Sequence, residues 1–187
     1  FELPSDWRFT RYALGDFVSV ARVLFVLAFI HFYARMTAAR RGCIGLGFAR
    51  SVMVFEIQEL LQRLRRYTGL DEPVLSSIVE DLTYGARLIR NPDPALQPLI
   101  PLTESLFGVG PNLILNSSLE RNFAVLLNRL PNEKEAYSKL SHEREKLLRQ
   151  RIQDELQELG VRFWHGEITG WGGAPDIDLA IISDAQK

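Results

Sequence analysis

The sequence has one cysteine (Cys43), three histidines and no surplus of either charge, with 22 basic and 23 acidic side chains among 187 residues. A single cysteine excludes a disulfide framework within the chain, and no Cys/His cluster has the spacing of a zinc site. A net charge of -1 gives no global sign of a nucleic-acid-binding protein. The composition, 47% hydrophobic and 24% charged, is typical of a globular chain long enough to bury a core without disulfides or structural metal.

The chain also lacks a long uninterrupted hydrophobic run. Residues 17–34 are the most apolar stretch, but Arg22 and His31 interrupt them, so that their longest run without a charged or histidine side chain is residues 23–30. A spanning helix needs about 20 predominantly apolar residues, and no small-residue cleavage site follows, as it would in a signal peptide. We therefore expect a helix in the middle of a soluble core, no membrane contact and a cytoplasmic protein.

Two amphipathic helices are predicted between residues 57 and 85. Apolar side chains recur at helical spacing from Ile57 to Leu64, and Gly69 is placed to end that helix. Asp71 and Pro73 are typical of the start of the next one. The pair fits a helical hairpin that packs on the apolar helix, and it also fits a helix-turn-helix that reads DNA.

Arginines are concentrated in the same part of the chain. From Arg35 to Arg66 there are seven arginines and two acids, which gives a local charge of +5. The candidates for contacts with the phosphates of DNA are Arg40, Arg41, Arg50, Arg63, Arg65 and Arg66. The same residues could equally form the solvated faces of the helices.

A proline-rich stretch, residues 91–116, is predicted to be a connection, with brief strands at Leu99–Leu102 and Leu113–Leu115. A helix that Pro131 stops and a long helix that ends at Gly160 follow. Residues 161–168 and 177–183 have strand composition on either side of a glycine-rich turn. We expect an α+β fold with a helical region (1–90), the connection (91–116) and a helix-plus-hairpin region (117–187).

Asp178 is the residue in this hairpin that needs an explanation. It stands near the start of a strand whose other members are apolar, and an unpaired buried carboxylate is costly. It therefore requires a partner, a proton or a cation, unless it lies at the solvated mouth of the strand or accepts N–H bonds from the glycine-rich turn.

The segment PDIDLAI, after a helix and a turn, resembles the core of the PD-(D/E)xK, or restriction-endonuclease-like, nuclease superfamily. In that pattern Asp178 matches the metal-binding Asp of the second strand, and Asp176 matches the acid before it. Glu145 matches the helix glutamate, because Leu148 and Ile152 follow it at the required offsets. The resemblance covers residues 133–187 and implies that Glu145, Asp176 and Asp178 bind Mg²⁺ in a deoxyribonuclease, with Glu145 and Asp178 as its catalytic residues.

The sequence departs from the pattern after Asp178, because no E-x-K or D-x-K follows. We therefore interpret the chain as the N-terminal part of a longer nuclease-like protein acting on DNA, inactive by itself and a weak binder of Mg²⁺. The alternative is a non-enzymatic α-helical module that binds a partner protein. An exposed strand edge recruits other strands, so we also expect a homo-oligomer through the C-terminal hairpin.

Overall fold

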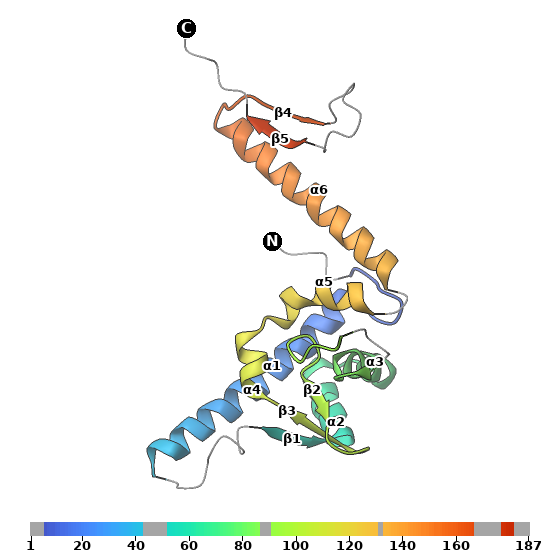
Figure 1. Cartoon of the computed structure of the whole chain (residues 1–187), viewed down its shortest axis with the longest axis vertical. Coiled ribbons are helices and arrows are strands. Elements are labelled where there is room, and N and C mark those ends of the chain that lie inside the picture. Colours follow the sequence, from blue (N-terminus) through green and yellow to red (C-terminus); the bar gives the residue numbers. More distant parts are fainter. Residues whose placement is uncertain (1–5, 43–51, 87–90, 131–132, 167–176, 182–187) are drawn as a thin grey trace. The chain divides into compact units, whose positions relative to one another are not determined.

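The computed structural model of the chain describes residues 6–42, 52–86, 91–130, 133–166 and 177–181. These residues form an α+β fold, as the sequence predicted (Figure 1). The contacts divide the chain into two compact units, Phe1–Tyr137 and Ser138–Lys187. In chain order the elements are α1 (Leu14–Arg40), β1 (Met53–Glu56), α2 (Ile57–Thr68), α3 (Glu72–Leu82), β2 (Leu99–Pro101), β3 (Leu106–Val109), α4 (Pro111–Asn116), α5 (Leu119–Arg129), α6 (Lys134–Glu158), β4 (Phe163–Gly166) and β5 (Ile177–Ile181).

α1 is the central helix of the N-terminal unit. It begins after Ala13, whose backbone N–H donates to the Asp16 carboxylate at 2.8 Å. Its first half is buried on one side, where α1 packs against α2, α3, α4 and α5. The ring of Phe17 stacks on that of Phe123 from α5, with centroids 4.1 Å apart, and aromatic pairs of this kind add to the energy of burial.

The expectation that the apolar helix lies in the middle of a core is wrong for the second half of α1. Beyond Leu24 only Ala28 of this helix is buried. Figure 1 shows that this half extends past α4. The exposed side chains include Phe29 and Tyr33, whose rings stack on each other with centroids 6.4 Å apart. Hydropathy predicted how apolar the helix is, but the neighbouring elements determine how much of it is covered.

α2 and α3 form the predicted pair of helices. Gly69 ends α2 with φ 71°, a left-handed conformation that costs glycine little. Asp71 occupies the N-cap position of α3, and Pro73 lies in its first turn. The two helices pack against each other and against α1, as a helical hairpin would.

The three-stranded sheet was largely missed by the sequence analysis. Its order is β1-β3-β2 with antiparallel pairing, so that Met53 and Leu99 both lie opposite Val109. β1 was not predicted, although its burial alternates along the strand. Residues 91–116 are therefore more than a connection, since they supply two strands and buried side chains at Leu99 and Phe107.

The strand predicted at Leu113–Leu115 is also wrong. These residues belong to α4, which has Pro111 in its first turn and Gly110 at its N-cap position. Proline is favoured there because its φ suits a helix and its missing N–H has no helical partner to lose. The unit boundary lies between Tyr137 and Ser138, whereas the predicted boundaries are at 90/91 and 116/117. The reason is that α4 and α5 pack on α1, β3 pairs with β1, and β2 pairs with β3.

α6, which belongs to the C-terminal unit from Ser138 onward, is the predicted long helix, and Gly160 comes shortly after it with φ 67°. Apolar side chains recur at helical spacing along this segment, but most of them are not buried: Leu148 is 53% exposed and Leu159, just after the helix, 76% exposed, whereas Leu140 is buried. β4 and β5 form the predicted antiparallel hairpin.

Candidate functional site

The β4–β5 hairpin carries Asp178, which is the second residue of β5. Trp164 lies opposite Ala180, and Gly166 lies opposite Ile177. Between these pairs β4 advances two residues while β5 advances three, so β5 holds one extra residue at Asp178 or Leu179. Such bulges are frequent beside active sites, because they redirect a side chain out of the regular strand pattern. Asp176 and the Asp178 side chain lie outside the described residues.

Glu145 lies near the middle of α6. Its side chain is 55% exposed, and its Oε1 accepts a hydrogen bond from Arg149 Nη2 at 2.7 Å, one turn along the helix. Glu145 stands about 20 Å along the helix axis from Glu158, at about 1.5 Å per residue. Within the described residues, α6 makes no extensive contact with β4 or β5.

The carboxylates of Glu145 and Asp178 are the kind of hard oxygen ligand that Mg²⁺ prefers. Among the described residues, however, no group of three or more His, Cys, Asp or Glu side chains could hold a metal ion. The Glu145 carboxylate, moreover, already accepts a hydrogen bond from Arg149. The described residues therefore do not assemble a complete metal centre.

The arginine cluster is divided between two helices. Arg40 is the last residue of α1 and Arg41 its C-cap, and both are exposed. Arg63 on α2 is held by Glu59 through hydrogen bonds of 2.6 and 3.1 Å, which offsets part of its charge. The guanidinium of Arg66 lies 5.9 Å from the ring centroid of Tyr67.

Two members of the cluster remain to be placed. Arg65 is exposed in the last turn of α2, and Arg50 lies outside the described residues. The described part of the cluster is therefore two short groups of cations, one at the end of each helix.

A buried polar network, which the sequence analysis did not find, lies in the N-terminal unit. Asp81 is 1% exposed and accepts hydrogen bonds from the Tyr12 hydroxyl at 2.7 Å and from Arg11. Gln97 donates to the backbone carbonyls of Asp81 at 3.0 Å and Thr83 at 2.8 Å. Burial and the neighbouring Asp81 raise the pKa of Tyr12 well above its usual range. The Asp81 carboxylate and the Gln97 amide thus find buried partners within the unit, which points to a structural role.

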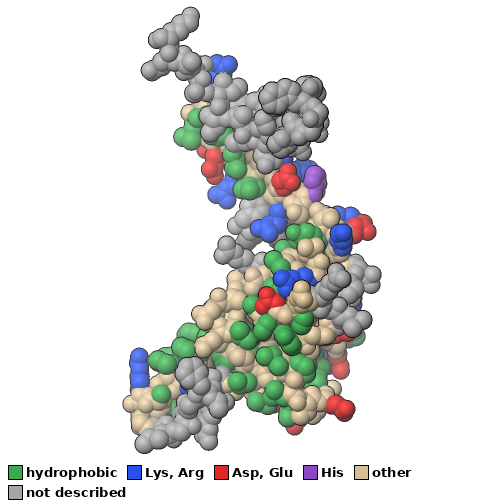
Figure 2. Space-filling model, in the orientation of Figure 1, with side chains coloured by type: hydrophobic (Ala, Val, Ile, Leu, Met, Phe, Trp, Pro, Cys, Tyr) green, Lys and Arg blue, Asp and Glu red, His purple; other side chains and the backbone are tan. Residues whose placement is uncertain are grey.

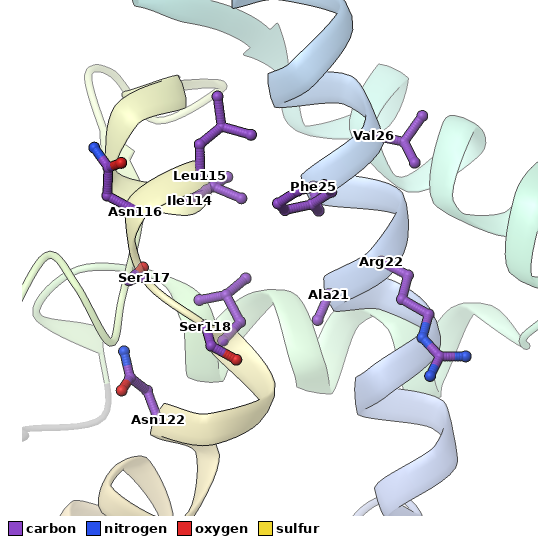
Figure 3. A pocket seen from close by; sticks show the side chains of 11 residues that line it. Ala21, Arg22, Phe25, Val26, Ile114, Leu115, Asn116, Ser117, Ser118 and Asn122 are labelled. Atoms are coloured by element: carbon purple, nitrogen blue, oxygen red, sulfur yellow. The ribbon is translucent and has the colours of Figure 1, made fainter.

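An open groove of about 980 Å³ lies between α1 and the segment from α4 to the start of α5. Figure 3 shows Phe25 pointing across it toward Ile114 and Leu115. Asparagine and serine side chains from residues 116–122 line the opposite part of the groove. Each wall of the groove therefore carries both apolar and polar side chains.

Comparisons of this chain with protein-family models, curated proteins and solved structures found no match.

Proposed function

We propose that residues 133–187 form the first half of a PD-(D/E)xK nuclease-like core that acts on DNA within a longer protein. The observation that carries the proposal is the order of the elements: a long helix, α6, precedes an antiparallel hairpin with Asp178 as the second residue of its second strand. The extra residue of β5 at Asp178 or Leu179 adds support, because a bulge is a common device beside an active site.

Asp178 would contribute one oxygen ligand from a strand whose backbone is fixed by pairing with β4. Glu145 would contribute a second ligand only after releasing Arg149. Both side chains of that ion pair are substantially exposed, so its release costs at most about 1 kcal/mol. A bound divalent cation would polarise the phosphodiester and lower the pKa of a water molecule.

The chain supplies neither the third acid nor the lysine that the resemblance requires after Asp178. We therefore expect millimolar or weaker binding of Mg²⁺ and no cleavage of DNA by this chain alone.

Isothermal titration with MgCl₂ and MnCl₂ tests the proposal on the full chain. We expect weak binding that Asp178→Asn abolishes and that Glu145→Gln reduces. Glu143→Gln is the matched control and should leave binding unchanged. Glu143 is also exposed on α6, but Lys146 and Gln150 stand at the offsets where the pattern has apolar residues. Micromolar binding that survives Asp178→Asn, or an equal loss in the Glu143 variant, would contradict the proposed site.

The alternative is a non-enzymatic interaction module, and the exposed apolar side chains of α1 favour it. An interaction module has no need of a metal. It therefore predicts that the Asp178→Asn variant and the unmodified chain give identical titrations.

A further inference from the structure

The second half of α1 presents one continuous apolar surface. We call it the α1 face; its members are Phe25, Val26, Phe29, Ile30, Tyr33 and Met36, which are between 41% and 66% exposed. At about 100° per residue they fall within an arc of about 140°. The buried residues Phe17, Val20 and Leu24 lie on the opposite side of the helix. The face is thus the side of α1 that the described residues of the N-terminal unit leave uncovered.

Arginines stand at both ends of this face. On the helical wheel Arg22 and Arg40 share the direction of the α1 face, about five turns apart. From Phe17 to Phe55 the sequence contains five arginines and no aspartate or glutamate. Figure 2 shows hydrophobic and basic side chains together on the second half of α1. The occupant of the face must therefore offer apolar surface together with negative charge.

A second copy of the chain, packed through its own α1 face, offers apolar surface but no negative charge. If two α1 faces packed antiparallel, Arg22 of each would lie near Arg40 of the other; if they packed parallel, like arginines would meet. Both arrangements bring like charges together beside an apolar contact, which disfavours self-association.

We infer that the α1 face attaches the protein peripherally to a lipid bilayer that carries anionic headgroups. By length and composition α1 is apolar enough to cross a membrane. The uncovered segment from Phe25 to Met36, however, is only about 18 Å long, against about 30 Å of hydrocarbon. Attachment at the interface follows, with the rings of Phe25 and Phe29 among the acyl chains and Arg40 and Arg41 at the headgroups.

Two further features suit this occupant. Tyr33 carries a hydroxyl on an aromatic ring, a combination favoured at the boundary between headgroups and acyl chains. Phe25 and Val26 also line the groove beside α4, so the apolar surface continues from the α1 face into the groove. The inference goes beyond the proposed nuclease-like core and departs from the expectation that the protein makes no membrane contact.

Flotation of the full chain with vesicles tests the inference. We expect binding to vesicles of phosphatidylcholine mixed with an equal amount of phosphatidylglycerol, and much weaker binding to phosphatidylcholine alone. Phe29→Asp should lower the affinity by about tenfold or more, because a ring leaves the acyl chains. Reversal of both Arg40 and Arg41 to Glu should lower it at least as much and weaken its dependence on salt.

Leu148→Asp is the matched control, since Leu148 and Phe29 are both 53% exposed but only Phe29 lies on the α1 face. It should bind vesicles like the unmodified chain. Circular dichroism checks that each variant is folded, and Ile30→Ser replaces Phe29→Asp if the latter is not.

Three results would overturn the inference. Equal binding to neutral and anionic vesicles would remove the role of the arginines. Absence of vesicle binding by the folded chain would exclude the bilayer. Self-association without lipid that Phe29→Asp abolishes would show that a second copy covers the α1 face.

Discussion

The N-terminal unit buries the apolar stripes of α2, α3 and α5, whereas α6 in the C-terminal unit leaves much of its stripe exposed. Leu64 and Leu75 are fully buried, but Leu148 on α6 and Leu159, the residue after it, are more than half exposed. α6 relies instead on contacts one turn apart, including the Arg149–Glu145 and Arg151–Glu155 ion pairs. Such exposed pairs are each worth about 0.3–0.5 kcal/mol.

The difference separates two sources of stability. In the N-terminal unit, side chains distant in sequence bury one another, so its folding is cooperative and sensitive to loss of volume. In α6, Leu140 is buried but most other side chains are exposed, and ion pairs join neighbours one turn apart. A helix with an uncovered apolar stripe is also one that a further layer of structure can cover, as the nuclease-like proposal requires.

The largest expected effect is a cavity in the N-terminal unit. Leu64→Ala should lower the free energy of unfolding by about 2–5 kcal/mol, because a fully buried leucine loses its contacts and leaves a void. Leu148→Ala is the comparison in α6 and should change the free energy of unfolding by no more than about 0.5 kcal/mol. Urea denaturation followed by circular dichroism measures both, and similar losses would show that the two regions do not differ.

Removal of the Tyr12 hydroxyl tests the buried network. Tyr12→Phe should cost about 1–3 kcal/mol, because the buried carboxylate of Asp81 loses a donor. The pKa of Tyr12 is raised in the folded protein, so its protonated form contributes stability that is complete below its ordinary pKa near 10. Above that pH the Tyr12 hydroxyl ionises in the unfolded chain but not in the folded one, which stabilises the unfolded state relative to the folded state.

Stability should consequently fall above about pH 10 by as much as about 1.4 kcal/mol per pH unit for this group. The difference in unfolding free energy between the unmodified chain and Tyr12→Phe should shrink over the same range. If that difference stays constant from pH 8 to pH 11, the raised pKa of Tyr12 does not contribute to the stability of the folded protein.

The C-terminal hairpin provides a test of exposed edges. Each of its two strands has one partner within the described residues, so its outer edges can accept another strand. We predict a concentration-dependent oligomer in light scattering, and Ile181→Lys should raise its dissociation constant about tenfold or more. If Ile181→Lys instead lowers the ellipticity in circular dichroism and leaves the molar mass in light scattering unchanged, another segment of the same chain already covers the edge.

The smallest effect is expected from the arginines. Any binding of a DNA duplex should weaken steeply with salt, and reversal of Arg40 and Arg41 should weaken it several-fold and reduce the salt dependence. Phe29→Asp should leave DNA binding unchanged, which distinguishes contacts with DNA phosphates from attachment to lipid. DNA binding that persists at high salt, or survives the double reversal, would contradict a phosphate-contact role.

The candidate site shows how far sequence reasoning reached. The hairpin that carries Asp178 was predicted because apolar runs on both sides of a glycine-rich turn are a local signal. The extra residue in β5 was not, since a bulge depends on the register between two strands. The pairing of Tyr12 with Asp81 was also missed, because 69 residues separate them and neither stands in a motif.

The sequence by itself determined the elements whose signals lie within a few residues. The end of α2 at Gly69, the start of α3 at Asp71 and the end of α6 before Gly160 follow from local backbone preferences and helical periodicity. Tertiary structure alone decided that β1 pairs with β3 and that, within the described residues, neighbouring elements cover mainly the first half of α1. The physical reason is that strand pairing and burial depend on which distant segments meet, whereas composition reports only that a segment is apolar enough to be buried.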